Sequence, residues 1–236
     1  SLPWAFRNAS GQAAGFDMEL LHRLALEFNV GLELVRLQPE EVGHALASEQ
    51  IDVYASGLLL DAHRFGDYEY SRPYAEATLG MLLSDHMRRT LEASRAFGTD
   101  LDIAVAFLQA PGLRRAAELV SPVNKLITLA SPRGFLNGER PDVDVLIMPA
   151  EAASAWTLVY PEFSVLVPKG KSVRIPLVFG LPREDAAFRA FMDRWILATR
   201  AIGIMDDAYE HWILGRSEEQ RQPRWSVIRD VLKWVD

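Results

Sequence analysis

Cysteine is absent from this chain of 236 residues. That absence excludes a disulfide framework, a thiolate nucleophile and a zinc site of the cysteine type. The five histidines are scattered and show no His-x-x-x-His spacing. Glu19 and Glu41 each stand three residues before a histidine, but these are two isolated pairs rather than a cluster. The sequence also lacks a glycine-rich phosphate loop and a Gly-x-Ser-x-Gly nucleophile motif. We therefore expect no metal site and no cofactor.

Lysine is scarce, and the formal net charge is −7, so a nucleic-acid partner is not expected. No apolar run approaches the roughly 20 residues of a membrane-spanning helix. A charged segment followed by an apolar one, as in a signal peptide, is not visible either. The opening residues have the pattern of the middle of a longer chain rather than of its start. We therefore expect a mature or excised segment that has lost its targeting information. A hydrophobic share of 49% supports a sizeable core.

Helical and strand-like patterns alternate along the chain. Apolar residues recur at helical spacing in residues 15–30 and 184–203, and Gly203 is expected to end the second helix. Residues 31–37 and 51–57 have the patterns of strands. A strand, helix, strand order over so few residues predicts parallel pairing with crossover helices.

The last residues have a different composition. Residues 216–223 are polar and predict a linker, whereas residues 224–236 carry Trp225 and Trp234 in an amphipathic pattern. This tail is either a helix packed back on its own domain or a connector that docks elsewhere.

An apolar run that starts at Ile51 breaks at Ser56 and Gly57 and is followed by Asp61 and Arg64. Loop N–H groups at the carboxyl end of a strand can hold an anion, and glycine allows a ligand to approach the backbone. The planar guanidinium of Arg64 suits a carboxylate, and Asp61 is expected to cap the helix that follows it. The alternative for Arg64 is an ordinary surface ion pair with Asp61 or Asp67.

Several short motifs occur in a specific order in the first 85 residues. They are Pro3-Trp4-Ala5-Phe6, Gly11, Gly15-Phe16-Asp17, Ala45-Leu46, Ile51-Asp52-Val53, Ser56-Gly57, Arg64, Tyr70-Ser71 and Pro73-Tyr74. In this order they resemble the N-terminal lobe of the family 3 extracellular solute-binding proteins, the polar amino-acid receptors of bacterial ABC importers. The closing stretch is similar to the C-terminal region of that family through Gly203, Asp207, Tyr209, Trp212 and Gly215.

The resemblance implies an α/β fold of the type II periplasmic-binding-protein class, in which two lobes are joined by two crossing strands. Each lobe is then a mostly parallel sheet flanked by helices. The implied ranges are 1–83 and 179–215 for lobe 1 and 84–178 for lobe 2, and residues 216–236 are the linker and tail.

The resemblance also implies roles for particular residues. An aromatic residue after the first proline forms a wall of the pocket in this family, which suggests Trp4 and Phe6; plain core packing is the alternative for both. Lobe 2 would contribute residues 107–113 and 149–156. The predicted ligand-binding residues are Trp4, Phe6, Ser56, Gly57, Leu58, Leu59, Asp61, Arg64, Phe107, Gln109 and Glu151.

Three positions depart from the pattern of the family's amino-acid receptors. Leu59 stands where they carry a hydroxyl, and Pro149 stands where they carry an acid that pairs with the ligand ammonium, with Glu151 as a nearby substitute. The Gly-Thr-Thr anion cradle is replaced at residues 107–113. An unpaired charge costs about 1–3 kcal/mol or more, so we expect a ligand other than the usual zwitterion.

The sequence thus predicts a periplasmic or otherwise extracytoplasmic domain that captures a small carboxylate-bearing or amino-acid-like solute in a cleft between its lobes. Capture would close the lobes and serve a membrane transporter. The tail resembles that of domains fused to dicarboxylate-symporter-like transporters, which would put the transporter in the same polypeptide. The alternatives are a cyclohexadienyl-dehydratase-like enzyme with Glu151 as general acid, and the ligand-sensing domain of a membrane receptor kinase. We expect a binding protein rather than an enzyme.

Overall fold

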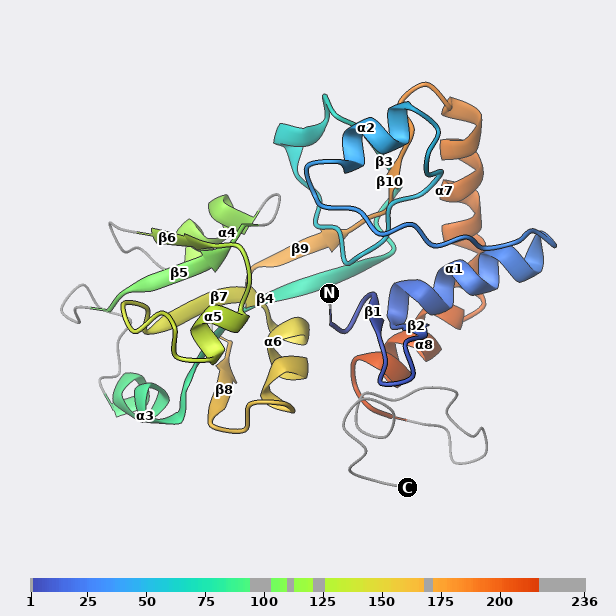
Figure 1. Cartoon of the computed structure of the whole chain (residues 1–236). Helices are drawn as coiled ribbons and strands as arrows, with labels where there is room; N and C mark the ends of the chain where they lie inside the picture. Colours follow the sequence, from blue (N-terminus) through green and yellow to red (C-terminus); the bar gives the residue numbers. More distant parts are fainter. Residues whose placement is uncertain (1, 94–102, 110–112, 121–125, 168–171, 217–236) are drawn as a thin grey trace. The chain divides into compact units, whose positions relative to one another are not determined.

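The computed structural model describes residues 2–93, 103–109, 113–120, 126–167 and 172–216 (Figure 1). The chain divides into two compact units, with residues 1–75 and 176–236 in unit 1 and residues 76–175 in unit 2. The predicted lobe ranges, which end at residues 83 and 178, stay a prediction. The predicted tail over residues 224–236 lies outside the described residues, so both interpretations of it remain open.

Unit 2 is built on a single mixed sheet. Its strands are β4 (Ala75–Ser84), β5 (Val105–Leu108), β6 (Leu126–Leu129), β7 (Val145–Pro149) and β8 (Phe163–Leu166) in the order β6-β5-β7-β4-β8, and β9 (Arg174–Leu177) also pairs with β4. β5 runs parallel to β6 and β7, whereas β4 is antiparallel to β7 and β8. The helices of this unit are α3 (Asp85–Ala93), α4 (Leu113–Val120), α5 (Arg133–Leu136) and α6 (Ala150–Thr157).

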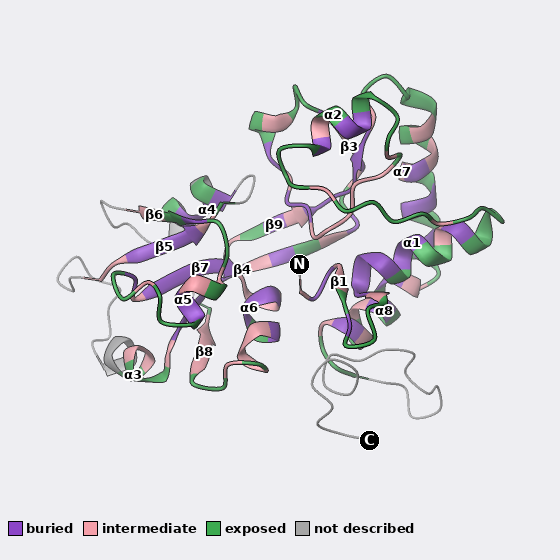
Figure 2. Ribbon diagram, in the orientation of Figure 1, coloured by how far each residue is buried: buried purple, intermediate pink, exposed green. Residues whose placement is uncertain are grey.

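The core of unit 2 follows from this pairing. Leu82, Ala106 and Leu146 lie in register on three neighbouring strands, and all three are fully buried. Figure 2 shows the same strands as the buried layer of the unit. Central strands covered on both faces are apolar at every position rather than at alternate ones, which explains the continuous run in residues 145–148.

Unit 1 is mainly helical. Its helices are α1 (Phe16–Glu27), α2 (Val42–Ala47), a short 3₁₀ helix η1 (Ala62–Arg64), α7 (Ala186–Ala201) and α8 (Ile204–Trp212). Its strands are β1 (Phe6–Arg7), β2 (Ala13–Ala14), β3 (Glu69–Tyr70) and β10 (Gly180–Leu181), which form two antiparallel pairs, β1 with β2 and β10 with β3.

The predicted helix boundaries of unit 1 are nearly correct. α1 and α7 are slightly shorter than residues 15–30 and 184–203, and Gly203 has φ +80°, as expected of the glycine after a helix. Phe16 and Leu20 of the predicted apolar stripe are fully buried, but Phe28 at its end is 47% exposed. The stripe therefore packs on the core only over its first turns.

Residues 31–37 and 51–57 do not form the expected parallel pair. Residues 31–37 stretch between α1 and α2 as an exposed segment, and in residues 51–57 only Tyr54 makes a bridge, antiparallel to Gly180 (Figures 1 and 2). A strand pattern favours an extended chain, but a ladder also needs a neighbour at hydrogen-bonding distance. No described residue takes that place beside residues 31–37.

Candidate solute-binding site

The corner of the chain at Ser56 and Gly57, which follows residues 51–55, is organised by Asp17. Asp17 was not among the predicted ligand-binding residues. Asp17 lies in the first turn of α1 and is fully buried. Its Oδ2 accepts a hydrogen bond from the Gly57 backbone N–H at 2.7 Å, and its Oδ1 accepts one from the Tyr74 hydroxyl at 2.8 Å. The Gly57 N–H, one of the groups expected to hold a ligand acid, is therefore bound to the protein's own carboxylate.

Burial determines the electrostatics of this corner. Desolvation raises the pKa of Asp17 to about 6, and the hydrogen bonds from Gly57 and Tyr74 oppose that rise. Burial, together with the neighbouring Asp17, also raises the pKa of Tyr74. Acidic residues are common in the first turn of a helix, and Glu19 is another in α1, so the sequence alone does not mark Asp17 as a site residue.

Trp4 closes the same corner from the other side. It is 2% exposed and packs edge-to-face on Phe16, with 5.8 Å between the ring centroids. Gly57 has φ +68°, and a Cβ at this position would lie 2.2 Å from Trp4 Cδ1. The glycine is thus required by the close approach of the Trp4 ring.

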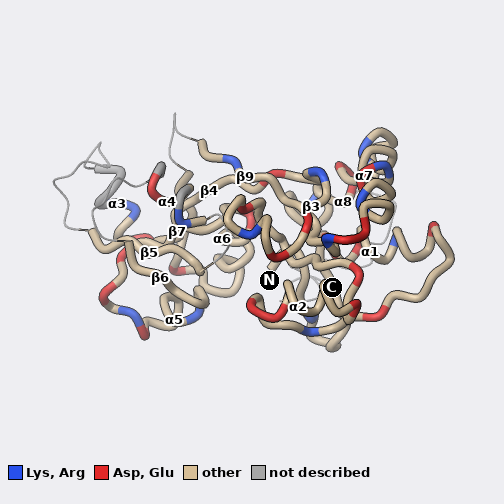
Figure 3. Tube along the Cα trace, turned by 90° about the horizontal axis from the view of Figure 1, so that it is seen from above, with Lys and Arg blue, Asp and Glu red and all other residues tan. Residues whose placement is uncertain are grey.

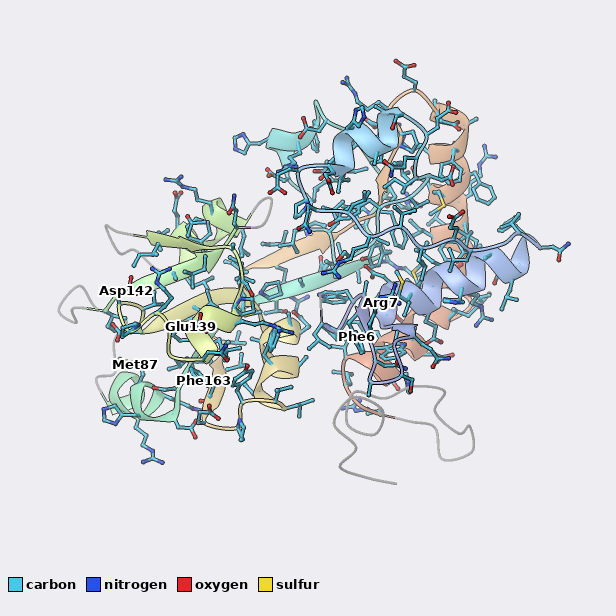
Figure 4. All side chains as sticks on the ribbon, in the orientation of Figure 1. Phe6, Arg7, Met87, Glu139, Asp142 and Phe163 are labelled. Carbon is cyan, nitrogen blue, oxygen red and sulfur yellow. The ribbon has the colours of Figure 1, made fainter. Side chains whose placement is uncertain are left out.

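Phe6 is less buried than Trp4. It lies on β1 (Figure 4) and makes an edge-to-face contact with Trp212 of α8, with 6.1 Å between the ring centroids. Its ring is half-buried, so part of its surface remains available to another molecule.

Leu58 and Leu59 belong to the core of unit 1. They are 5% and 3% exposed, and Leu58 packs with Val42, Leu46 and Val178. Leu59, at the position where the resemblance implied a hydroxyl, makes an isolated bridge with Leu177. In this structure both side chains form the packing behind the corner.

Asp61 caps η1, as the sequence predicts. It has an extended backbone, and its Oδ1 accepts a hydrogen bond from the His63 N–H at 3.0 Å. The Tyr70 hydroxyl donates to the Asp61 carbonyl at 3.2 Å, which fixes the turn from behind.

Arg64 ends the same short helix, and its side chain is 30% exposed. Its Nη1 lies 3.8 Å from Asp67 Oδ2 and 3.4 Å from the Pro39 carbonyl. The ion pair with Asp67 was one of the two predicted alternatives for this residue. Because both contacts are long, they hold the guanidinium weakly.

In Figure 3, acidic and basic residues are interspersed along the described parts of the chain trace. Near the corner, Arg64 and Asp67 form a local pair of opposite charge.

The predicted residues of unit 2 lie on β5, directly after it and on α6. Phe107 is buried within β5, in register with Ile147, whereas Gln109 is exposed and donates its backbone N–H to the Leu129 carbonyl at 2.7 Å. Glu151 begins α6, and its two carboxylate oxygens lie 3.0 and 3.2 Å from the Thr78 N–H of β4. Burial raises the pKa of Glu151, and the hydrogen bond from Thr78 opposes the rise.

Residues 1–215 match the family described as bacterial extracellular solute-binding proteins, family 3. The chain belongs to this family. The prediction from the motif order is therefore confirmed, and so is the fold class.

Solved structures of the same fold cover most of the chain. The ancestral amino acid-binding protein AncCDT-1, a precursor of cyclohexadienyl dehydratase, has a TM-score of 0.74 at 23% identity, over 90% of this chain and 91% of that chain. A binding component of an ABC transporter from Wolinella succinogenes, complexed with lysine, has a TM-score of 0.74 at 19% identity, over 90% and 91%. The arginine-, lysine-, histidine-binding protein ArtJ from Geobacillus stearothermophilus has a TM-score of 0.70 at 18% identity, over 95% of each.

Among curated proteins, the chain is 26% identical to a cyclohexadienyl dehydratase from Pseudomonas aeruginosa over 219 residues, which are 89% of this chain and 78% of that protein. Proteins similar to this chain thus include binding proteins and an enzyme, and the choice between these functions depends on the site itself.

The structure places the predicted residues in two groups. Trp4, Phe6, Ser56, Gly57, Leu58, Leu59, Asp61 and Arg64 lie in unit 1, and Phe107, Gln109 and Glu151 lie in unit 2. Within the described ranges, no cluster of His, Asp and Glu is arranged to bind a metal ion. In that same part of the chain, no helix is both long and apolar enough to cross a membrane.

Proposed function

We propose that this family 3 domain captures a small carboxylate-bearing solute outside the cytoplasm and delivers it to a membrane transporter. Family membership supports the solute-binding role, and structural neighbours named for lysine and arginine binding support a ligand of amino-acid size. Capture would favour a closed arrangement of the two units through contacts that only the closed state makes.

The observation on which this proposal rests is the weakly held guanidinium of Arg64. Its guanidinium is partly exposed, and an exposed ion pair such as the one with Asp67 is worth only about 0–1 kcal/mol. A ligand carboxylate can replace Asp67 at little cost and form charge-assisted, bidentate hydrogen bonds. Asp61 supports the exchange because its cap holds the turn on which Arg64 stands.

The remaining predicted residues of unit 1 fall into two groups, according to how far their side chains are exposed. We assign ligand contact to Ser56 and Phe6, which are half-buried, and assign Trp4, Leu58 and Leu59 to the packing behind them. Since the Gly57 N–H is bound to Asp17, the ligand acid has fewer backbone donors than a free loop would offer. A solute with one carboxylate and an apolar body fits this set better than a zwitterion does.

A thermal-shift screen tests the proposal. The panel holds lysine, arginine, glutamine and a series of mono- and dicarboxylates, and the proteins are the wild type, Arg64→Ala and Arg23→Ala. Arg23 is the matched control, because it is an exposed arginine of unit 1 that is paired with Glu27 at 3.2 Å.

A true ligand at 100 times its Kd adds about 2.7 kcal/mol, which raises Tm by roughly 5–10 °C in a domain of this size. We expect this rise in the wild type and in Arg23→Ala, and its loss in Arg64→Ala. A carboxylate that stabilises Arg64→Ala as strongly as the wild type would remove Arg64 from the site.

A dehydratase is the second candidate, favoured by the relative from Pseudomonas aeruginosa. Glu151 is the group that fits a general acid, because burial raises its pKa and so favours the protonated form. The assay measures turnover of prephenate by the wild type and by Glu151→Gln, in which the amide oxygen can still accept from the Thr78 N–H. Turnover that is lost in Glu151→Gln would establish the enzyme, and the absence of turnover in the wild type would exclude it.

A further inference from the structure

One buried carboxylate touches the solute-binding corner from inside unit 1. Asp17 is fully buried; its Oδ2 lies 2.7 Å from the Gly57 backbone nitrogen, and its Oδ1 lies 2.8 Å from the Tyr74 hydroxyl oxygen. Gly57 is one of the residues predicted to contact the solute, and it precedes Arg64 in the same short segment. Asp17 therefore lies directly behind the backbone that is expected to meet the solute acid.

Hydrogen bonds, and not a cationic side chain, stabilise the charge of Asp17. Among the described residues, the groups that favour its ionised form are the Gly57 N–H and the Tyr74 hydroxyl, and the amino terminus of the chain adds to them. Tyr54 is a further titratable group close enough to feel its charge. Burial opposes all of these effects and raises the pKa of Asp17 to about 6. A carboxylate in this environment takes up a proton readily.

The two partners of Asp17 respond differently to that proton. The Gly57 N–H can only donate, whereas the Tyr74 hydroxyl can either donate or accept. A proton on Oδ1 can therefore be donated to the Tyr74 oxygen while Oδ2 still accepts from Gly57. Burial raises the pKa of Tyr74, so its own hydroxyl stays protonated. Protonation thus removes the negative charge behind Gly57 and keeps both contacts in place.

Ionised Asp17 opposes an anionic solute at this corner in two ways. It places a like charge close to the solute acid, at a buried position where solvent screens charges poorly. It also accepts a short, charge-assisted hydrogen bond from the Gly57 N–H, which commits that donor to the protein. A protonated Asp17 is neutral and accepts a weaker bond, so the solute acid can share the Gly57 N–H.

We propose that Asp17 is a proton-linked positioning residue of the solute site: the corner captures a solute carboxylate together with one proton, which Asp17 takes up from the solvent. This inference rests on the proposed function, because it needs a carboxylate beside Gly57 and Arg64. Proton uptake and solute binding then strengthen each other by the same factor. The solute is bound more tightly at acidic than at neutral pH, and a rise in pH favours its release.

His63 offers a rival explanation for any effect of pH on binding. It is exposed and stands next to Arg64 on η1. Histidine side chains in general change charge between about pH 5 and pH 8, and a positive charge at this position would also attract an anion at low pH. The experiment therefore needs variants that separate Asp17 from His63.

Isothermal titration calorimetry with 4-methyl-2-oxopentanoate tests the proposal. This α-keto acid has one carboxylate and an apolar body, and its carboxyl group stays ionised from about pH 5 to about pH 7.5. Kd is measured over that range. Titrations near pH 6.5 in two buffers of different ionisation enthalpy give the number of protons taken up. The proteins are the wild type, Asp17→Asn, Tyr74→Phe and His63→Gln.

We expect the Kd of the wild type and of His63→Gln to rise at least about fivefold from pH 5 to pH 7.5, with uptake of protons on binding. The amide of Asp17→Asn mimics the protonated carboxyl group, so its Kd should stay at the wild-type value for pH 5 throughout, without proton uptake. Tyr74→Phe removes a donor that favours the ionised form, so its rise in Kd should occur at higher pH.

A dependence of Kd on pH that persists in Asp17→Asn, or that disappears in His63→Gln, would overturn the proposal. If Asp17→Asn does not fold, a Tyr74→Phe profile that coincides with the wild-type profile would overturn it instead. An equal wild-type Kd at pH 5 and pH 7.5 would also overturn it, but would leave solute capture intact. No binding at pH 5 by any of the four proteins would contradict solute capture at this corner, and the proposal with it.

Discussion

The two units of this chain are held together by different kinds of hydrogen bond, although strands and helices alternate in both. In unit 2, the ten-residue strand β4 pairs along both edges, and its Leu82 is fully buried. In unit 1 the ladders are two residues long, and residues 31–37 pair with no described residue. The difference shows that an extended pattern becomes a sheet only where a neighbouring strand is in place.

In unit 1, hydrogen bonds that involve side chains take the place of long ladders. They join residues that lie far apart in the sequence, either between two side chains or from a backbone N–H to a side chain. Asp17 binds the Gly57 N–H, the Trp195 Nε1 donates to Glu27 at 2.7 Å, and the Trp212 Nε1 donates to Glu19 at 2.5 Å. Such contacts depend on single residues, whereas a ladder spreads its stabilisation over many backbone groups. Single substitutions should therefore cost more in unit 1 than at comparable positions of unit 2.

Gly57→Ala should give the largest effect. The new Cβ would lie 2.2 Å from Trp4 at φ +68°, so backbone strain of about 1–2 kcal/mol adds to overpacking of about 1–3 kcal/mol. We expect a loss of about 3 kcal/mol in urea unfolding. Gly11→Ala is the control in the same unit, because Gly11 has φ +78° with nothing within 4 Å of its Cβ, and it should lose only about 1–2 kcal/mol. Equal losses would show that Trp4 does not constrain Gly57.

Asp17 should make the stability of unit 1 depend on pH. Burial raises its pKa from 3.8 to about 6, so the folded state binds more protons than the unfolded state between these values. The contribution of Asp17 to the free energy of unfolding is fully present below pH 3.8 and is lost as the pH rises through about 6. The shift of about 2 pKa units corresponds to roughly 3 kcal/mol at most.

The measurement is unfolding free energy from pH 4 to pH 8 for the wild type and Asp17→Asn. The amide can accept from the Gly57 N–H and donate to the Tyr74 hydroxyl, so Asp17→Asn should fold and should lose this part of the pH dependence. Parallel curves for the two proteins would exclude Asp17 as the titrating group.

Glu151 should have a smaller effect on unit 2. Glu151→Ala leaves the Thr78 N–H without its acceptor, which should cost about 1–2 kcal/mol, whereas Glu151→Gln keeps an acceptor and should cost less than about 0.5 kcal/mol. Thermal unfolding of the two variants checks this order. If Glu151→Ala were as stable as the wild type, the bond from Thr78 would have no structural role.

Arg64→Ala should have the smallest effect on stability. Its 3.8 Å ion pair with Asp67 is exposed, so the loss should stay below about 0.5 kcal/mol in urea unfolding, similar to that of Arg23→Ala. A loss above 1 kcal/mol would mean that Arg64 holds the fold rather than a ligand.

The sequence predicts the helices and the family of this protein well, because amphipathic stripes and short motifs are local signals. The Asp61 cap and the Gly203 helix end belong to the same class of local chemistry. Asp17 was missed as a site residue, because its partners Gly57 and Tyr74 lie 40 and 57 residues away and no local pattern connects them.

The pairing of residues 31–37 was wrong for a related reason. The alternation of GLELVRL predicts a strand, but pairing depends on which segment lies beside it, and that is a property of the tertiary fold. The apolar residues 75–84 do form ladders as β4, since β7 and β8 both lie beside this strand.

Residue-resolved hydrogen exchange on the wild-type chain tests the contrast between the units most directly. We predict that the amides of residues 32–37 exchange near their intrinsic rates, whereas those of Leu82, Ala106 and Leu146 are protected at least about a thousandfold. Protection of residues 32–37 to the level of Leu82 would contradict the account, because it would show that unit 1 has a ladder where these residues are now unpaired.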